Sequence, residues 1–542
     1  MGKGGSVPEQ WDAIVVGAGI GGLTTASLLA KEGLSTLVLE KEDRVGGRAV
    51  SLRGEEVAEK GAEWYRRLLG GQYSYLAQSD PPLEEMAASG LLDGYVLDLG
   101  FHGVSVAGEG YFATLRDLLG GFGDREVVIK PFLTGAWLED NLVEVTIPVI
   151  GDMAVDERLQ AEFDRLGRNY LDFFGDLSQL SFDRLANLGE MSLYDYLGEI
   201  GFVKSAEELE RLDSVSLNDH LASIGFTGSK LVCDYFRCLC TLFTTINNPN
   251  EISMGDILRY ASQVMIPAIL SGVKINIGGY VQDGVMEWPK AVAGRCEDLG
   301  GEIRLETRVT GVEIEHGRVK GVRVESAEGE ESIPAPRVVM NPPIQELFRY
   351  VDDKAFAGGF TQEVGSLYGY GSLSPYFGLK ELPFPEKHAE RLMLTPCVVP
   401  REEGFDWDVY IAWGIQSYIE PSCAPAGKHL FTAYLPLTEE ESRNRELAMK
   451  VVRTVPDFLE SLYPGFKDCI EWALYPVCWK LEGVAKSVTQ AGSLKPEVKA
   501  PGVEGLYFAG DTARGYGVAM DCACSSGIIC ASEITGIDYG VS

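Results

Sequence analysis

Apolar and polar residues follow several distinct patterns along the chain, and each pattern predicts its own kind of element. Near the N-terminus, residues 12–16 form a short apolar run that ends at a glycine-rich turn, which is typical of a buried strand. Residues 23–31 then repeat apolar side chains at helical spacing, and residues 34–40 form a second apolar strand that ends in an acid. Together they predict one strand–helix–strand unit with parallel strands.

The middle of the chain has a different period. A strand is expected at residues 95–102. From residue 152 to residue 271, segments such as DERLQAEFDRLGRNYLDFF and KLVCDYFRCLCTLFTTI place apolar residues three and four positions apart. This stretch predicts a helical insertion rich in Phe, Tyr, Leu and Met.

The second half returns to alternating strands and helices. The pair Gly278–Gly279 is expected in a turn before a helix, and a β-hairpin is expected to turn at His316–Gly317. Arg337–Met340 predicts a further short strand. Residues 360–480 mix strands with one helix, Glu439–Tyr463.

The C-terminal stretch LYFAGDTARGYGVAMDCACSSGIICASEI predicts a buried strand, a glycine turn and a helix of small residues. Similar α/β character at the start, middle and end of the chain predicts an α/β fold with one discontinuous Rossmann-type domain. The stretches between them predict a substrate domain made of a mixed sheet and helices. The expected boundaries are 8–95, 275–345 and 481–542 for the nucleotide-binding domain, and 96–274 and 346–480 for the substrate domain.

Composition narrows the class of function. With 542 residues, about two or three domains are expected. A net charge of −33 argues against nucleic acid as a partner, and five histidines argue against a metal site. Eleven cysteines without regular spacing fit a reducing compartment. Because neither a secretory signal nor a spanning segment is predicted, we expect a cytoplasmic protein, with at most weak peripheral contact with a membrane.

The first glycine turn carries the strongest chemical signal. GAGIGG, residues 17–22, matches G-x-G-x-x-G between a strand and a helix, the pattern of a dinucleotide site. Gly17 permits the tight turn, Gly19 lets a pyrophosphate approach the backbone, and Gly22 lets helix and strand pack closely. Glu40, at the end of the second strand, is placed to accept hydrogen bonds from a ribose diol. These residues alone leave NAD and FAD as alternatives.

Two later motifs extend this site. Residues 44–48, RVGGR, combine a glycine pair for close backbone approach with two arginines that can donate to a pyrophosphate. Asp511 follows a predicted strand, where a carboxylate can bond the ribityl chain of a flavin. A helix beginning near Val518 would direct its N-terminus at the flavin pyrimidine ring.

With these motifs in place, the chain resembles the phytoene desaturase and carotenoid isomerase-like branch of the flavin-containing amine oxidoreductases. The resemblance runs nearly from end to end and includes GAGIGG, RVGGR, LDLGFH at 97–102, TRVTGVEIEHGRVKGV and GLYFAGDTARGYGV. It implies non-covalent FAD, a hydrophobic small-molecule substrate, and an adenine contact through the backbone at Arg308 and Val309. Motifs and resemblance together assign FAD binding to Gly17, Gly19, Ile20, Gly21, Gly22, Glu40, Lys41, Arg44, Gly46, Gly47, Arg48, Gly61, Ala62, Glu63, Val309, Gly510, Asp511, Gly517, Val518 and Ala519.

The chain departs from the family pattern at the substrate end. Monoamine oxidases place an aromatic residue before the methionine of the last helix, whereas Ala519 precedes Met520 here, which disfavours an amine substrate. No catalytic residue is assigned, because flavin-mediated desaturation needs little more than a C–H bond held against the ring. His102, Lys480 and Tyr516 are weak candidates.

The sequence therefore predicts an FAD-dependent oxidoreductase that desaturates, saturates or isomerises an isoprenoid or other alkene-bearing substrate by hydride transfer at flavin N5. Two alternatives remain open. One is a flavin amine or amino-acid oxidase, and the other is a prenyl-lipid-binding escort protein that shares the fold without catalysis. The oligomeric state is not predicted.

Overall fold

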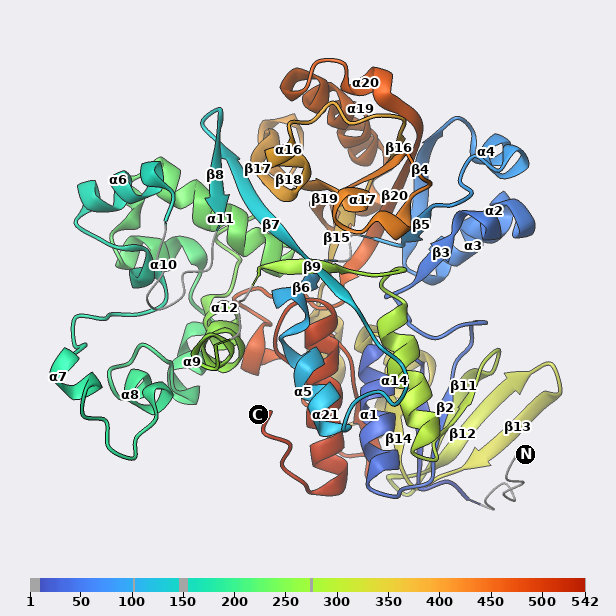
Figure 1. Ribbon diagram of the computed structural model, residues 1–542. Coiled ribbons are helices and arrows are strands. Elements are labelled where there is room, and N and C mark those ends of the chain that lie inside the picture. Colours follow the sequence, from blue (N-terminus) through green and yellow to red (C-terminus); the bar gives the residue numbers. More distant parts are fainter. Residues whose placement is uncertain (1–9, 101–102, 146–154, 273–275, 542) are drawn as a thin grey trace.

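The structure is a computed structural model that describes residues 10–100, 103–145, 155–272 and 276–541 (Figure 1). Five short parallel strands form a sheet in the order β10-β2-β1-β14-β21. The strands are β1 (Ala13–Val16), β2 (Thr36–Leu39), β10 (Glu302–Arg304), β14 (Val338–Met340) and β21 (Leu506–Phe508). They come from the start, the middle and the end of the chain, so the predicted α/β class with a discontinuous parallel sheet is confirmed.

Alternate residues of these strands face two different layers, as the two-residue period of a strand requires. Val15, Val38 and Val339 pack in one hydrophobic cluster with the helices of one face. Ile14 and Leu37 belong to another cluster, with the three-stranded sheet of the opposite face. The covering helices are α1 (Ile20–Lys31), α5 (Tyr111–Leu118), α14 (Glu287–Asp298) and α21 (Met520–Thr535), which stand side by side in Figure 1.

The small antiparallel sheet contains β11 (Arg308–Glu315), β12 (Arg318–Ser326) and β13 (Gly329–Pro334). Its first turn lies at His316 and Gly317, with φ of 52° and 76°. Two positive φ angles are what a two-residue type I′ hairpin requires, so the predicted hairpin is confirmed.

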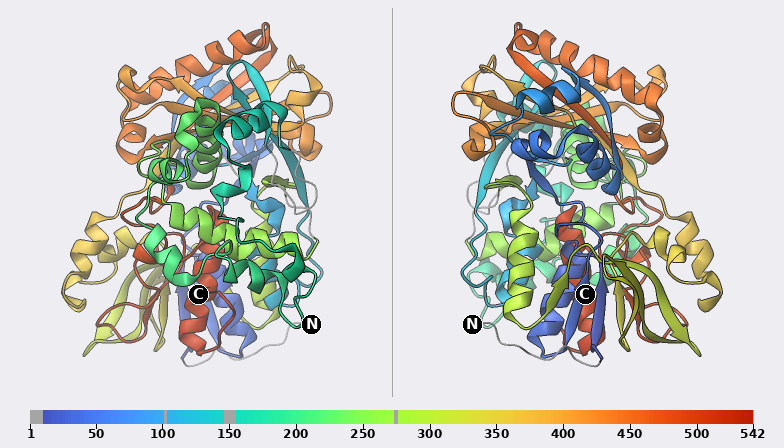
Figure 2. Two further views of the ribbon diagram at one scale, coloured as in Figure 1. Left: turned by 90° about the vertical axis from the view of Figure 1, so that its left-hand side faces the viewer. Right: turned by 90° about the vertical axis from the view of Figure 1, so that its right-hand side faces the viewer.

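A large mixed sheet lies above the parallel sheet in Figure 1, and the two views in Figure 2 show the same two-storey arrangement. Its order is β15-β20-β16-β19-β18-β17-β7-β9-β6, and β17 and β7 pair in parallel. The strands are β15 (Tyr370–Leu373), β20 (Ile470–Glu482), β16 (Tyr376–Leu379), β19 (His429–Thr438), β18 (Val409–Ile415), β17 (Arg391–Val399), β7 (Ile129–Leu138), β9 (Gly278–Val281) and β6 (Val104–Ser105). At its margins β4 (Ser74–Asp80) pairs with β20, and β8 (Asn141–Val145) pairs with β7.

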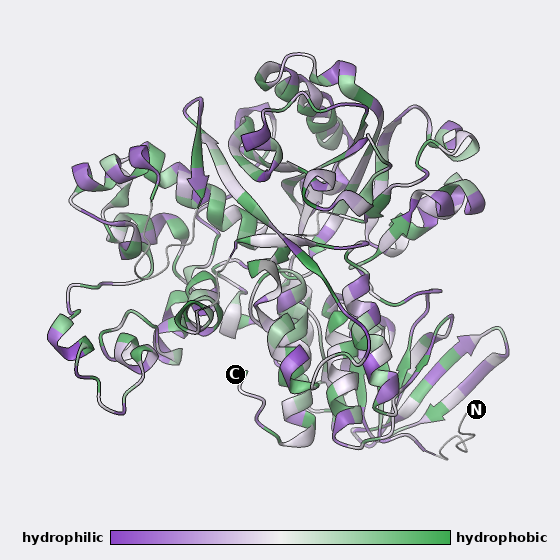
Figure 3. Ribbon diagram, viewed as in Figure 1, coloured by the Kyte–Doolittle hydropathy of each residue, from purple (hydrophilic) through white to green (hydrophobic). Residues whose placement is uncertain are grey.

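The predicted helical insertion is confirmed. Its helices are α6 (Glu157–Leu166), α7 (Phe182–Leu185), α8 (Leu193–Glu199), α9 (Ala206–Leu212), α10 (Leu217–Ser223), α11 (Lys230–Thr244), α12 (Met254–Tyr260) and α13 (Ile266–Leu270). Rings of Phe173 and Phe236 stack with centroids 4.0 Å apart in its core. Both hydrophobic and hydrophilic residues occur on these helices in Figure 3, as expected where one face is buried.

Two predicted elements have different forms. The pair Gly278–Gly279 lies in strand β9 rather than in a turn, and pairs there with β6 and β7. The close backbone requires glycine, because an added Cβ at Gly278 would stand 2.5 Å from the Phe132 ring. The predicted helix Glu439–Tyr463 is two helices, α18 (Glu439–Arg443) and α19 (Arg445–Leu462). Asn444 between them has an extended ψ of 98° and caps α19 with its side chain, which ends one helix and starts the next.

The remaining elements surround the two sheets. Within the predicted strand 95–102, β5 covers only Val96–Asp98 and pairs with β3 (Ser51–Arg53), while residues 101–102 lie outside the described residues. Helices α2 (Gly54–Lys60), α3 (Ala62–Gly71) and α4 (Leu83–Ser89) lie beside the upper sheet. The others are α15 (Phe360–Ser366), α16 (Glu386–Ala389), α17 (Gln416–Ile419) and α20 (Phe466–Cys469).

The chain passes between the layer of the parallel sheet and the layer of the large mixed sheet (the two storeys) more often than the predicted domain boundaries suggest. Strands β4 and β9 lie within segments expected in the nucleotide-binding domain, yet they pair in the large sheet. Helix α5 lies within a segment expected in the substrate domain, yet it packs on α21 beside the parallel sheet. These elements join the two storeys at the level where the main cavity lies.

Candidate functional site

The main cavity opens at the carboxyl ends of the parallel strands, where ligands bind in open α/β sheets. Gly17 and Gly19 line it from the turn after β1, and Glu40 from the end of β2. Asn341 follows β14 and Gly510 follows β21, and both also line it. The cavity then continues upward between the large sheet and the helical insertion.

The glycine turn has no room for side chains. A Cβ added at Gly19 would lie 2.7 Å from Asn341 Oδ1, and one at Gly21 would lie 2.6 Å from the backbone nitrogen of Gly510. The amide of Asn341 is fixed by donating to the Ala509 carbonyl over 2.9 Å. Gly47, with φ of 59°, brings the second glycine motif within van der Waals reach of the first, because its Cβ would stand 3.1 Å from Gly19 Cα.

Helix α1 begins at this turn without a capping side chain and without an acid in its first turn. Its first N–H groups and the positive end of its dipole therefore suit an anion. The close glycine backbone and the uncapped helix fit the diphosphate of a dinucleotide.

Glu40 lines the end of the cavity next to β2, which is the end predicted to hold a ribose. Its two carboxylate oxygens accept from the Ala18 nitrogen over 2.7 Å and from the Glu42 nitrogen over 2.9 Å. The side chain is buried, and this burial raises its pKa, although both backbone bonds oppose the rise. Val309 lines the same end of the cavity.

Arg48 and Asp511 form an ion pair at the middle of the cavity. Arg48 also donates to the carbonyls of Lys480 and Leu481, over 2.9 and 3.2 Å. Asp511 accepts from the Gly483 nitrogen over 2.7 Å. Burial opposes ionisation of Asp511, but Arg48 and this backbone bond lower its pKa overall. The pair thereby ties the second glycine motif and the turn after β21 to the end of β20 and to Gly483, which follows it.

The upper end of the cavity is apolar. Among the described residues its walls come from the large sheet, the helical insertion and the loop before α21. They include Val104, Phe132, Leu242, Phe243, Ile277, Leu392, Tyr434, Leu481 and Val518. A narrower apolar hollow between α11 and α12 shares Phe243 and Val518 with this end. A long hydrocarbon chain would be held here by burial rather than by charge.

A buried polar cluster joins the helical insertion to the start of α21. Asp521 accepts from the Tyr260 hydroxyl over 2.6 Å and from the Ser105 hydroxyl over 2.8 Å. Burial raises the pKa of this carboxyl. Ala519, just before the helix, has a φ of 48°, a strained angle for a residue other than glycine. The strained residue lines the cavity at the N-terminus of α21.

Most of the predicted cofactor residues meet at this cavity. Its described lining includes Gly17, Gly19, Ile20, Gly21, Glu40, Lys41, Gly46, Gly47, Arg48, Val309, Gly510, Asp511, Val518 and Ala519. Gly22 lies behind the turn, where a Cβ would stand 2.4 Å from the Gly17 carbonyl, so it serves the close packing expected of it. Gly517 lines the narrower hollow instead.

Four predicted residues lie elsewhere. Arg44 pairs with Asp43 and Glu56 beside a separate polar hollow. Gly61, with φ of 84°, joins α2 to α3, and Ala62 packs in the cluster behind that turn. Glu63 is exposed and pairs with Arg66. These four residues lie outside the described lining of the main cavity, and their assignment to the cofactor stays a prediction.

The sequence interpretation missed several lining residues. Leu99 and the segment 103–105 line the cavity but were not predicted to do so. The signal was present, since LDLGFH directly precedes this segment and was noted as a family motif. Asn341 and Glu482 were also missed. Asn341 could have been found, because it directly follows the predicted strand at residues 337–340. Glu482 could not, because it lies in a segment that lacks the family pattern.

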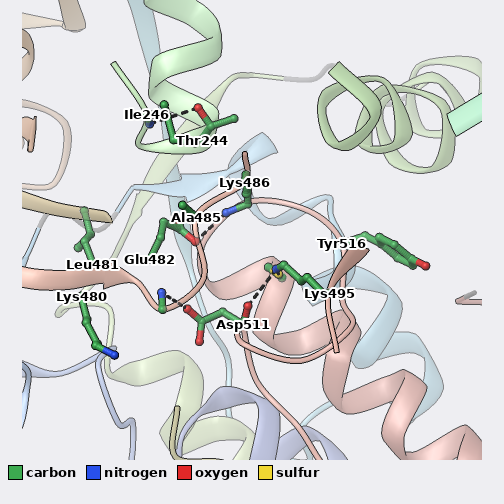
Figure 4. A network of polar contacts seen from close by, with 12 residues as sticks. Thr244, Ile246, Lys480, Leu481, Glu482, Ala485, Lys486, Lys495, Asp511 and Tyr516 are labelled. Carbon is green, nitrogen blue, oxygen red and sulfur yellow. Dashed lines mark hydrogen bonds and ion pairs between the residues drawn. The ribbon is translucent and has the colours of Figure 1, made fainter. Parts of the chain in front are cut away.

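The cavity lining does not include the candidate catalytic residues that the structure describes. His102 lies outside the described residues. Lys480 and Tyr516 are absent from the described lining, and in Figure 4 both point away from Glu482 and Lys486. Tyr516 stacks under the Arg259 guanidinium, 4.9 Å from the ring centroid, and burial lowers the pKa of Lys480. Both residues therefore lie in surroundings that suit a structural role.

Two other kinds of site were considered from the sequence, a metal site and a membrane-spanning segment. Among the residues that the structure describes, no cluster of three or more His, Cys, Asp or Glu side chains has the arrangement of a metal site. No described helix combines the length and apolar character needed to cross a membrane.

Comparison with known proteins identifies the family. A family model described as "Flavin containing amine oxidoreductase" matches residues 20–535. The chain belongs to this family. The predicted enzyme class is thus confirmed. The family implies a bound flavin, and the closely packed glycine turns at residues 17–22 and 46–47 (the glycine cradle), together with Glu40, fit FAD in the cavity.

The proteins that resemble this chain in sequence include distant relatives. The chloroplastic prolycopene isomerase of Arabidopsis thaliana is 23% identical over 559 residues, covering 98% of this chain and 83% of the isomerase. The all-trans-retinol 13,14-reductase of Danio rerio is 66% identical, but over 41 residues, or 8% of this chain and 7% of the reductase. A solved oxidoreductase from Methanosarcina mazei shares the fold, with a TM-score of 0.59 and 16% identity over 97% of this chain and 100% of that one.

Replacing Glu40 tests the ribose end of this flavin site. Glu40→Ala is expected to weaken FAD binding by about 1–3 kcal/mol, because charge-assisted hydrogen bonds to the ribose are lost. The ionised carboxylate is the form that accepts these bonds. Since burial raises the pKa of Glu40 in the absence of ligand, affinity should fall as the pH drops through that raised value.

Titration of the apoprotein with FAD at several pH values, followed by flavin fluorescence, measures both effects. Glu40→Gln is the matched control: its affinity should lack the part of the pH dependence that Glu40 contributes. An unchanged affinity in Glu40→Ala would place the ribose elsewhere.

Proposed function

We propose that the protein is an FAD-dependent oxidoreductase that desaturates, saturates or isomerises a hydrophobic, alkene-bearing substrate of isoprenoid type. The observation that carries the proposal is the apolar upper end of the cavity. Among the described lining residues, the carboxylates of Glu346, Glu482 and Asp511 each already pair with a basic side chain, which is Arg349, Lys486 and Arg48 in turn. An amine substrate would need an unpaired carboxylate or an aromatic cage, and Ala519 stands where that cage would need a ring.

The names of two relatives support the same substrate class. One is a prolycopene isomerase matched over nearly the whole chain, and the other is an all-trans-retinol 13,14-reductase matched over a short segment. Both names refer to long unsaturated isoprenoids. Burial contributes about 0.8 kcal/mol per methylene, so such a chain can be bound without a charged anchor.

We further propose that FAD is held without a covalent bond. Cys478 is the cysteine among the described lining residues, and its burial raises the pKa of the thiol, so it is a poor nucleophile. Acid treatment of the purified protein should release intact FAD into the supernatant. A yellow pellet would show covalent attachment.

We also propose a cellular compartment for the protein. All eleven cysteines are unpaired, which supports a reducing, cytoplasmic compartment. A hydrophobic substrate would have to be collected from a membrane or a carrier, so weak peripheral contact with a membrane is compatible with this function.

A substrate panel tests the proposal. We expect the flavin to be reduced or reoxidised by a long apolar alkene and not by simple amines, for the steric and electrostatic reasons above. Prolycopene, all-trans-retinol, a fatty acyl ester, benzylamine, putrescine and an amino acid would each be mixed anaerobically with the protein. The oxidised and the chemically reduced protein are both used, and the flavin absorbance band reports each reaction.

Rapid bleaching by an amine, without a response to any alkene, would assign the protein to the amine oxidases instead. A protein that neither binds FAD nor reacts, but extracts prenyl lipids, would favour an escort function.

A further inference from the structure

Glu482 lies at the point where the flavin-binding segments meet the apolar end of the cavity. It is the last residue of β20 and lines the cavity, with its side chain only 2% exposed. The neighbouring backbone is fixed from both sides. Arg48 donates to the carbonyl of Leu481, and Asp511 accepts from the nitrogen of Gly483. Glu482 is thereby held beside the residues that fit the flavin.

Lys486 is the partner of Glu482. Its ammonium donates to Glu482 Oε2 over 2.7 Å, and its side chain is 1% exposed (Figure 4). Burial opposes the charge on Lys486, but the carboxylate of Glu482 raises its pKa overall. The backbone of Lys486 is fixed too, since its carbonyl accepts from the Ser253 nitrogen over 3.1 Å.

Other titratable groups surround the pair. Tyr434 of β19 and Cys522 of α21 are within electrostatic range of Glu482. Asp256 of α12 is close enough to act on Lys486. On the far side, Lys495 donates to the Asp511 carbonyl over 2.9 Å and to Cys522 Sγ over 3.2 Å.

A buried ion pair is a poor way to stabilise a fold. Moving two charges out of water costs several kcal/mol per ion, and apolar residues of the same volume serve stability as well or better. A pair kept at the wall of a cavity is therefore a candidate for chemistry, all the more where the rest of that wall is apolar.

We propose that Glu482 is the residue that exchanges a proton with the bound substrate, with Lys486 as its positioning residue. The inference rests on the proposed function, and it names the side chain that accepts or donates the proton in that reaction. Glu482 lines the cavity beside the flavin-binding segments and is therefore within reach of a bound alkene, whereas Lys486 acts through Glu482.

In the direction of desaturation, two hydrogens leave neighbouring carbons. The C–H bond beside the reacting carbon breaks, its electron pair becomes the new C=C bond, and its proton passes to the Glu482 carboxylate. The other hydrogen would leave with two electrons as a hydride, for which a bound oxidised flavin, the oxidant of this family, would be the acceptor. In the direction of saturation the protonated Glu482 would return its proton to one carbon, and a bound reduced flavin would supply the second hydrogen with its two electrons to the neighbouring carbon.

Glu482→Gln removes the proton acceptor while keeping size and a hydrogen bond to Lys486. With the alkene that responds in the panel, prolycopene or all-trans-retinol, kcat should fall by about 100-fold or more. KM should change by less than about threefold, and the FAD content and the substrate Kd, measured by fluorescence quenching, should stay at the parental values. For a saturation run in D₂O, the parent should place a solvent deuterium on the carbon that Glu482 protonates, in addition to the deuterium delivered from the exchangeable N5 position of the reduced flavin, at a rate that the variant cannot match.

Lys486→Met tests the positioning residue. Without the adjacent cation the carboxylate is harder to form, so the acidic limb of the pH–rate profile should move to higher pH. Lys486→Arg keeps the cation and should restore the parental limb. Glu441→Gln is the matched control, because Glu441 is a buried glutamate that accepts from the Asp406 and Thr438 nitrogens away from the cavity. It should change stability without changing the pH profile.

The outcomes separate this inference from the proposed function. A reacting alkene with parental kcat and pH profile in Glu482→Gln would overturn the role of Glu482 and leave the proposed function standing. Should Glu482→Gln fail to fold, Glu482→Asp decides: a parental rate overturns the role, and a slowed rate with retained FAD supports it. If no alkene reacts with the parent, the proposed function fails and this inference fails with it.

Discussion

A Gly19→Val variant is expected to purify without flavin. The added Cβ would stand 2.7 Å from Asn341 Oδ1, and the rest of the side chain would fill the space through which a diphosphate approaches the turn. Asn341 cannot easily move aside, because its side-chain amide donates a hydrogen bond to the Ala509 carbonyl. We expect the 450 nm flavin band to disappear, which is a fall of at least about 100-fold in FAD affinity.

The control for this experiment is Gly198→Val. Gly198 lies in α8, and no atom stands within 4 Å of a Cβ built there. Circular dichroism would show whether both variants keep the fold. Parental FAD content in Gly19→Val would mean that the cofactor lies outside the glycine cradle.

The second large effect is expected on stability. Arg259 and Asp213 form a bidentate ion pair with both distances at 2.9 Å, and their side chains are 4% and 0% exposed. Arg259→Leu leaves the Asp213 charge buried without its cation. The free energy of unfolding should fall by about 3–5 kcal/mol, as urea denaturation of the flavin-loaded protein would measure.

Arg318→Leu provides a matched comparison. Arg318 and Glu504 are also 2.9 Å apart, but both side chains are about two-thirds exposed. Solvent screens such a pair, so the change should stay within about 0.5 kcal/mol. Equal effects of the two substitutions would show that burial does not set the strength of these contacts. Asp213→Asn added to Arg259→Leu should recover part of the lost stability.

The sequence alone predicted those parts of the site that depend on local signals. The strand, glycine turn and helix at residues 12–31 lie in one unbroken segment, so their periodicity and their glycines were sufficient. Glu40 and Asp511 could be predicted for the same reason, since Glu40 directly follows β2 and Asp511 lies in the turn after β21. The hairpin at His316–Gly317 was likewise a local feature.

The rest depends on contacts between distant segments. Gly61 looked like a cofactor glycine, whereas its positive φ serves the junction of α2 and α3. Glu482 reaches the cavity because β20 pairs with strands on either side in the large sheet, and no local pattern encodes that pairing. The break at Asn444 shows the same limit at small scale: helical spacing continues through it, but the side chain caps the following helix instead.

The order of the parallel sheet has a consequence for how the protein is made. Strand β1 at the N-terminus is bordered by β14, which in turn is bordered by β21 near the C-terminus. The backbone of Gly510 closes on Gly21, nearly five hundred residues earlier in the chain. A ribosome must therefore synthesise the chain at least as far as Gly510 before the cradle can close. We infer that FAD is taken up only after this point, and that shorter nascent or prematurely terminated chains expose their unpaired strands without a cofactor to protect them.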